Sequence, residues 1–344
     1  MSDSRPRHPA PPIDPEIASL LPPIPDLAEP TDDSTVTEQR AALAAIMAPI
    51  KQSILSDPSI AHTERTIPSP GGPLAISVLT TKAPASGKAA PKRRPGIVHF
   101  HGGGMTMGDR WVGMGLVAEY VRTLDAVAIT VEYRLAPEHA HPAPVEDCYA
   151  TLAWAGAHAD ELGVDGARLM VAGESAGGGL AAAVALMARD RGGPALCAQL
   201  LVCPMLDDRN ESVSSRQVVG GGTWSRRRNL FGWRCLLDEK AGGDDVSCYA
   251  APARATDLSG LPQAFIDAGS AETFRDEDVA YASKLWECGV QAELHVWPGG
   301  PHAFHSFLPN AALSRVANAT RTNWVRRVLK ENPNVASNDV TSKI

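Results

Sequence analysis

One serine stands in a setting that could make it a nucleophile. The pentapeptide GESAG at 173–177 fits the pattern Gly-x-Ser-x-Gly, and it joins an apolar stretch at 169–172 to a run of small residues beginning at Ala176. A sharp turn from strand to helix at this point would hold the hydroxyl of Ser175 beyond the edge of a sheet, at the positive end of a helix. Such a turn brings other backbone close to the two flanking glycines, so both positions need small residues. We therefore expect Ser175 to be the nucleophile.

Three consecutive glycines provide backbone donors that could bind the negative charge formed on an attacked carbonyl oxygen. They belong to the sequence HGGG at 101–104, directly after another apolar stretch. Glycine lets the backbone approach a substrate closely and turn its N–H groups inward. We expect the N–H groups of Gly103 and Gly104 to act as this oxyanion hole, with Gly102 adjacent and Ala176 as a further donor. A phosphate-binding loop is disfavoured, because no Walker-type lysine and no GxGxxG pattern follows.

A serine hydroxyl needs a base to remove its proton, and histidines late in the chain are the candidates. In hydrolases with this serine motif the acid follows the serine and the histidine follows the acid. His302 and His305 lie in a Gly- and Pro-rich loop after the strand expected at 292–297, where the base belongs. His295 lies within that strand and is expected to be packed or exposed. We expect His302 to be the base, with His305 as the fallback.

The acid that orients this histidine is expected in the loop after the strand at 263–268. Four carboxylates compete for the role: Glu272, Asp276, Glu277 and Asp278. From residue 275 onward the pattern is helical, so the three later acids would occupy a first helical turn, where negative charge is stabilising. Asp267 lies inside the expected strand. Glu272 lies on the loop itself, and we expect it to complete the triad.

The elements that would position these residues are short apolar stretches alternating with longer helical patterns. Strands are expected at 96–100, 126–132, 169–172, 199–203, 263–268 and 292–297. Helices are expected at 112–123, 145–159, 176–189, 275–287 and 311–330. This alternation predicts an α/β protein with a mostly parallel central sheet and helices on both faces. Nucleophile, acid and base would then meet at one edge of the sheet.

The N-terminal part of the chain does not follow this alternation. Residues 1–35 are too rich in proline for one continuous helix. The stretch 37–55 has the apolar spacing of an amphipathic helix, which we expect to break near Pro49. A strand is expected at 74–79, and 82–95 reads as an exposed loop.

Two later segments also stand apart. Residues 205–250 are rich in glycine and arginine and interrupt the alternation, as a cap over the site or a large surface loop would. Residues 331–344 form a polar tail that we expect to be disordered. The tail ends in Ser342-Lys343-Ile344, one residue away from the peroxisomal address SKL.

Charge and composition limit the function further. A net charge of −7, with an isoelectric point near 5.8, argues against nucleic acid or an anionic membrane as a partner. The apolar run at 180–188 is too short to span a bilayer and reads as a buried helix. The first residues lack the features of a signal peptide, so we expect a cytoplasmic protein, with a peroxisomal location as the alternative. The six cysteines have no CxxC spacing and are expected to be free thiols.

Together these motifs resemble the hormone-sensitive-lipase-like esterases of the α/β-hydrolase superfamily. The matching segments are HGGG at 101–104, YRLAPE at 133–138, ED at 146–147, GESAGG at 173–178, LP at 261–262, RDE at 275–277 and the loop that carries His302. They span about residues 96–305.

The resemblance implies a serine carboxylesterase for short- to medium-chain esters that acts through an acyl-enzyme, with an α/β-hydrolase fold and a helical cap. The catalytic domain would be residues 61–330, and the cap would come from 1–60 and the insertion at 205–245. Residues 133–138 and Asp147 would brace the loops near the site. The family usually has an aspartate where this chain has Glu272, whose longer side chain can fill the same orienting role.

Several alternatives remain open at this point. A small-molecule binding protein on a hydrolase scaffold would share the fold, and amides, carbamates or lactones would use the same triad. The pairs His99/His101 and His139/His141 have the spacing of metal ligands, but no third ligand has a clear place. We expect His101 to be structural, no cofactor or metal, and a small-molecule ester as the partner. The sequence leaves a homodimer open.

Overall fold

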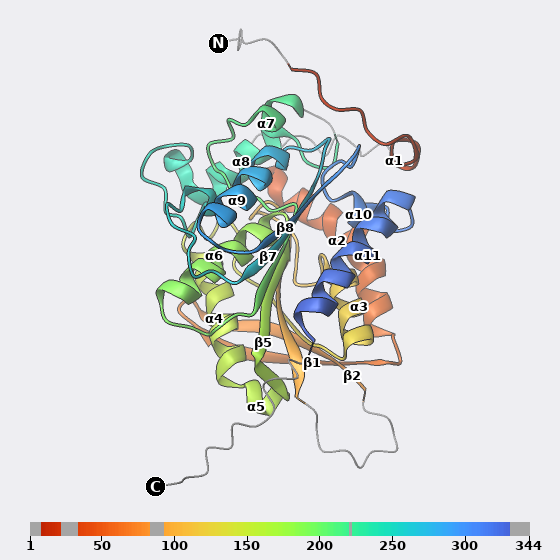
Figure 1. Cartoon of the computed structure of the whole chain (residues 1–344), viewed down its shortest axis with the longest axis vertical. Coiled ribbons are helices and arrows are strands. Elements are labelled where there is room, and N and C mark those ends of the chain that lie inside the picture. The colour runs from red at the N-terminus through yellow and green to blue at the C-terminus, as the bar shows by residue number, and fades with distance from the viewer. Residues whose placement is uncertain (1–7, 22–33, 83–92, 220–221, 331–344) are drawn as a thin grey trace.

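The computed structural model describes residues 8–21, 34–82, 93–219 and 222–330. Its eight strands form one sheet in the order β1-β2-β4-β3-β5-β6-β7-β8 (Figure 1). The strands are β1 (Ile60–Ser69), β2 (Gly72–Thr81), β3 (Arg94–Phe100), β4 (Val127–Val131), β5 (Val164–Glu174), β6 (Ala198–Val202), β7 (Gln263–Gly269) and β8 (Ala292–Trp297). β1, β2 and β4 pair antiparallel, whereas β3, β4, β5, β6, β7 and β8 pair parallel. The prediction of a mostly parallel sheet is therefore confirmed.

Helices cover both faces of this sheet (Figure 1). Those of the central region are α3 (Met114–Leu124), α4 (Ala143–Ala157), α5 (Ala159–Leu162), α6 (Ala176–Asp190), α9 (Arg275–Glu287), α10 (Phe304–Phe307) and α11 (Ala312–Val328). α4, α6 and α9 contribute to one hydrophobic core, and α3 and α11 contribute to the core on the other face. The run at 180–188 is a buried part of α6, as predicted.

The remaining helices lie in the N-terminal segment and in the insertion after β6. They are α1 (Pro15–Leu20), α2 (Ser34–Leu55), α7 (Val213–Gln217), α8 (Arg226–Leu237) and the 3-10 turns η1 (Asp238–Lys240) and η2 (Pro252–Arg254). α2 reaches both cores, since Val36 packs in the first and Ile54 in the second. No helix in the described part of the chain is long and apolar enough to cross a membrane.

Most predicted elements are found within a few residues of their expected ends, and two predictions need correction. The helix expected to break near Pro49 is continuous from Ser34 to Leu55. A proline inside a helix removes one backbone hydrogen bond and crowds the preceding turn, but burial of Met47 and Ile54 on either side favours the continuous helix. The strand β1 was not expected, because its polar sequence has few apolar residues to reveal the edge of a sheet.

The six cysteines are free, as predicted. Other predictions fall on parts of the chain outside the described residues. These are the tail at 331–344 with Ser342-Lys343-Ile344, most of the loop at 82–95, and much of the proline-rich segment at 1–35.

A buried ion pair joins α11 to the sheet, at β7. Arg321 Nε donates to Asp267 Oδ2 at 2.8 Å, and the indole N–H of Trp297 donates to the same oxygen at 2.7 Å. Arg321 and Asp267 are each at most 1% exposed. Asp267 thus helps to pack α11 against β7 and β8, and it lies inside a strand, as predicted.

We expect Arg321→Met to lower the free energy of unfolding by about 3–5 kcal/mol, because it leaves the Asp267 charge buried without its partner. Urea denaturation followed by circular dichroism measures the change. The exposed Arg326 on the same helix provides the control, and Arg326→Met should stay within about 0.5 kcal/mol of the parent. Equal stability of the two variants would contradict this reading.

Candidate active site

Ser175 occupies a strained turn between β5 and α6. Its backbone angles are φ 59° and ψ −122°, a conformation that costs a non-glycine residue about 1–3 kcal/mol. Two hydrogen bonds hold it there: Ser175 N–H donates to Val202 O at 2.8 Å, and Met205 N–H donates to Ser175 O at 2.9 Å. The neighbouring strand β6 and the segment after it therefore fix the turn that the motif predicts.

The two glycines that flank the serine are required by close packing. A Cβ atom on Gly173 would lie 2.1 Å from Gly177 O, and one on Gly177 would lie 2.0 Å from Phe100 O. Backbone atoms cannot move aside as a flexible side chain could. The expectation that only small residues fit at these positions is confirmed.

Three side chains from distant parts of the chain form one hydrogen-bonded series. His302 Nε2 lies 2.9 Å from Ser175 Oγ, and His302 Nδ1 lies 2.6 Å from Glu272 Oε2. The other oxygen of Glu272, Oε1, accepts a hydrogen bond from Gly269 N–H at 2.6 Å. Since a carboxylate only accepts, His302 donates from Nδ1 and its Nε2 is left to accept the serine proton. All three side chains are buried. They follow the ends of three strands, β5, β7 and β8.

The competing acids have other partners or none. Asp276 Oδ2 accepts from Ser214 N–H at 2.7 Å, and Glu277 Oε1 accepts from Leu206 N–H at 2.8 Å. Neither oxygen of Asp278 has a partner among the described residues. Burial raises the pKa of Glu277 and that of Asp278 well above the usual range. All three lie in the first turn of α9, as predicted.

His305 is not part of the series around Ser175. Its Nε2 lies 3.3 Å from Glu174 Oε2, and its Nδ1 lies 3.3 Å from Arg321 Nη2. His295 stacks between Phe265 and Trp297 in β8, so it is packed as expected. The sequence reasoning had assigned no role to Glu174, although it stands inside the serine motif.

The loop at 101–104 carries backbone donors that have no acceptor. No described residue accepts a hydrogen bond from the N–H groups of Gly102, Gly103, Gly104 or Ala176. Gly103 and Gly104 have φ values of 130° and 60°, which favour glycine. Gly102 and Gly103 line the pocket at Ser175, whereas Gly104 lies against the ring of Trp224, which a Cβ atom there would meet at 2.1 Å.

Neighbouring residues hold this loop in place. The hydroxyl of Tyr133 donates to His101 O at 2.8 Å, and the two rings stack with centroids 4.0 Å apart. Ala136 N–H donates to Met105 O at 2.9 Å. The guanidinium of Arg134 binds the buried carboxylate of Asp147. The segment at 133–138 therefore holds the loop at 101–104 in place, Asp147 binds this segment through Arg134, and His101 is packed against Tyr133.

The pocket at Ser175 has a volume of about 260 Å³. The α2 helix lines it with Leu43, Ile46 and Met47, and the insertion lines it with Thr223, Trp224 and Arg228. The other lining residues are Gly102, Gly103, Met107, Val112, Glu174, Ser175, His302, Ala303, Ser306 and Phe307. Its walls are thus mostly apolar. The sequence could not place the α2 residues here, because their helical spacing shows a buried face but not what that face covers.

Neither of the His-x-His pairs joins a cluster of three metal ligands among the described residues. The one cluster found there consists of Cys203, Glu272 and His302. Burial raises the pKa of the Cys203 thiol well above its usual range, and the other two side chains already bind one another. Since metals bind the thiolate, this donor set does not fit a resident metal ion.

Comparison with known proteins agrees with this fold and site. A family model described as an α/β-hydrolase fold matches residues 97–306. The esterase LipI of Mycobacterium tuberculosis is 32% identical over 252 residues, which cover 69% of this chain and 73% of LipI. The carboxylesterase NlhH of the same species is 34% identical over 223 residues, covering 62% of this chain and 67% of NlhH. Among solved structures, a bacterial heroin esterase is 36% identical with a TM-score of 0.84, over 93% of this chain and 98% of that one.

The chain belongs to the hormone-sensitive-lipase-like family of α/β hydrolases. The family and the fold predicted from the motifs are confirmed. These relatives are esterases, the class of enzyme that the sequence predicts for this chain.

We expect Gly177→Ala to disrupt the serine turn, because the added methyl group would overlap the carbonyl oxygen of Phe100. The predicted loss is at least about 2 kcal/mol of unfolding free energy, in the range of overpacked cores. Differential scanning calorimetry reports it as a lower Tm. Gly166→Ala in β5, the strand that leads into the serine turn, is the control, since a Cβ atom there has no neighbour within 4 Å. An unchanged Tm for Gly177→Ala would contradict the packing.

Proposed function

We propose that the protein is a serine carboxylesterase that hydrolyses short- to medium-chain esters through a Ser175–His302–Glu272 triad and an acyl-enzyme intermediate. The observation that carries the proposal is the hydrogen-bonded series from Ser175 Oγ through His302 to Glu272, next to backbone donors without acceptors. An amide, a carbamate or a lactone would meet the same groups. The esterase relatives favour an ester.

In the first half of the reaction His302 Nε2 takes the proton of Ser175 while Oγ attacks the ester carbonyl. The carbonyl oxygen becomes an oxyanion, which the N–H groups of Gly103, Gly104 and Ala176 bind, with Gly102 adjacent. Glu272 stabilises the imidazolium that forms. His302 then gives its proton to the leaving alcohol, and the acyl group stays on Ser175.

In the second half, water takes the place of the alcohol. His302 accepts a proton from this water as its oxygen attacks the acyl carbon, and the same backbone donors bind the second oxyanion. The carboxylic acid leaves as the proton returns to Ser175 Oγ. In each half of the reaction His302 acts once as base and once as acid, so one imidazole ring serves both halves.

We further propose that α2 and the insertion after β6 form a cap that limits substrate size. Three residues of each segment line the pocket, whose volume is about 260 Å³. Such a small, mostly apolar pocket suits a short acyl chain. A binding protein on the same scaffold would need neither the base nor the acid, and all three members of the series are present here.

We expect Ser175→Ala to lower kcat for p-nitrophenyl acetate by roughly 10³-fold or more while the protein still folds, because the nucleophile is removed. Stopped-time assays give kcat, and the circular dichroism spectrum checks the fold. Turnover close to that of the parent would refute the assignment.

We expect Glu272→Gln to lower kcat by about 10²- to 10⁴-fold, because the amide does not stabilise the imidazolium and permits the wrong tautomer. Glu272→Asp should keep partial activity, since the carboxylate survives but is set back by one methylene. The matched control is Asp276→Asn in the first turn of α9, four residues further along the chain, which should keep kcat within a few-fold. A silent Glu272→Gln together with a crippled but folded Asp276→Asn would show that the acid is wrong.

We expect kcat/KM to be highest for acyl chains of about two to eight carbons, because the capped pocket encloses only a small ligand. A series of p-nitrophenyl esters from acetate to palmitate measures the preference. A sharp rise in activity above the solubility limit of a long-chain triglyceride would contradict it.

A further inference from the structure

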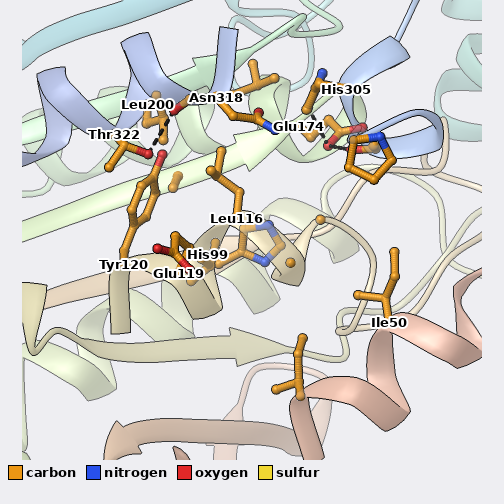
Figure 2. A pocket seen from close by; sticks show the side chains of 18 of the residues that line it. Ile50, His99, Leu116, Glu119, Tyr120, Glu174, Leu200, His305, Asn318 and Thr322 are labelled. Carbon is orange, nitrogen blue, oxygen red and sulfur yellow. Dashed lines mark hydrogen bonds and ion pairs between the residues drawn. The ribbon is translucent and has the colours of Figure 1, made fainter. Parts of the chain in front are cut away.

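A second and larger cavity adjoins the catalytic pocket, with a volume of about 550 Å³ (Figure 2). Its floor is the face of the sheet beneath α3 and α11, and α2 closes one side. Apolar walls come from residues such as Ile50, Leu116 and Leu200. It shares three residues with the catalytic pocket, namely Met47, Glu174 and Ser306. Neither Ser175 nor His302 lines it, so the proposed reaction does not account for it.

His99 offers this cavity a hydrogen-bond acceptor. Its Nδ1 lies 3.4 Å from Thr130 Oγ1, which itself donates to Arg110 O at 2.8 Å. The hydroxyl proton of Thr130 is therefore used, and His99 must donate from Nδ1. Burial lowers the pKa of His99 to about 3, so the ring is neutral and Nε2 carries a lone pair. No described residue donates to that nitrogen, although His99 is only 3% exposed.

Glu174 offers a second acceptor, which is charged. Its Oε2 accepts from Ser306 Oγ at 2.6 Å and lies 3.3 Å from His305 Nε2. Because Arg321 donates to Nδ1 of His305 and burial lowers its pKa, His305 donates to Glu174 as a neutral ring. Burial opposes ionisation of Glu174, but the hydrogen bonds that it accepts from His305 and Ser306 favour the charged form, and its pKa is lowered. Its other oxygen, Oε1, accepts from no described residue.

The two acceptors face a common space at the start of α3. An atom attached to Cα of Gly113 would lie 3.0 Å from His99 Nε2 and 3.8 Å from Glu174 Oε2. Glycine leaves that position empty. A ligand atom cannot occupy that point, which lies at bonding distance from the Cα atom. The missing side chain leaves His99 Nε2 uncovered on this side, and the two distances show that both acceptors border the same part of the cavity, whose other walls are largely apolar.

We propose that this cavity is a second binding site, for a small apolar molecule that carries a hydroxyl or amino group as hydrogen-bond donor. An amino group donates to both His99 Nε2 and Glu174, whereas a hydroxyl donates its one proton to His99 Nε2. The apolar part packs against α2, α3 and the sheet. A hydrocarbon of the same shape would bury both acceptors without a partner, which is costly. The ligand is a molecule separate from the ester, since the nucleophile and the base lie outside the cavity.

Binding is tested on the Ser175→Ala protein, which separates it from turnover. Three probes share one apolar group: 2-phenylethylamine, 2-phenylethanol and ethylbenzene. Isothermal titration calorimetry should give affinities for the amine and the alcohol at least about tenfold higher than for ethylbenzene. In a crystal soaked with 2-(4-bromophenyl)ethanol, the anomalous signal of bromine should lie between Ile50, Leu116 and Leu200.

Variants identify the two acceptors. In the same background, His99→Leu should weaken both polar probes by about tenfold or more, and Glu174→Gln should weaken the amine more than the alcohol. His158→Leu, on the opposite side of the sheet, is the control and should leave the affinities unchanged. Circular dichroism confirms that each variant folds.

The proposal fails if ethylbenzene binds as tightly as the alcohol, if none of the probes binds at millimolar concentration, or if bromine occupies the catalytic pocket alone. Equal effects of His99→Leu and His158→Leu would also overturn it. Each of these outcomes leaves the proposed esterase activity standing, and loss of that activity in Ser175→Ala leaves the cavity proposal standing.

Discussion

The geometry of the candidate active site depends on one imidazole ring that is held at both nitrogens. His302 comes from a loop after β8, and it meets Glu272 on one side and Ser175 on the other. Hydrogen bonds of 2.6 Å and 2.9 Å tolerate little displacement, so the ends of β5, β7 and β8 must keep their relative positions. The parallel sheet supplies this rigidity, because β6 pairs with both β5 and β7 and β7 pairs with β8. The paired strands also hold the strained backbone conformation of Ser175 in place.

A second buried polar series runs alongside the first. Asp267 binds Arg321, Arg321 donates to His305, and His305 donates to Glu174, the residue directly before the serine. The charge of Asp267 is paired with the guanidinium of Arg321, and Glu174 accepts hydrogen bonds from His305 and Ser306. An unpaired charge in the protein interior would be expensive. This series anchors α11 and α10 to the sheet from beneath. It also sets the wall between the catalytic pocket and the larger cavity beside it.

Local sequence patterns were enough to predict which side chains lie together at the strand ends. Ser175 and its glycines follow from the demands of one tight turn, and His302 follows from a Gly- and Pro-rich loop after an apolar strand. Glu272 could be distinguished from Asp276 because acidic residues favour the first turn of a helix. That pattern places Asp276 in the helix and Glu272 in the loop before it. In each case the sequence pattern that predicts a residue lies within about ten positions of that residue in the chain.

Features that depend on packing between distant segments could not be predicted in this way. The continuity of α2 through Pro49 depends on what the helix packs against, and β1 is an edge strand whose sequence is largely polar. The cavity beside the active site joins α2, α3, α11 and three strands, none of which carries a motif for it. Glu174 stands at a variable position of the serine motif, so only its contacts reveal that it separates two pockets.

The central claim is that the hydroxyl of Ser175 is activated by His302, and reaction with a fluorophosphonate tests it most directly. The serine oxygen would form a bond to phosphorus as fluoride leaves, with the proton passing to His302. Mass spectrometry of the intact protein followed by peptide mapping should find one adduct per chain, located on Ser175. An unlabelled protein, or an adduct on a different residue, would contradict the account.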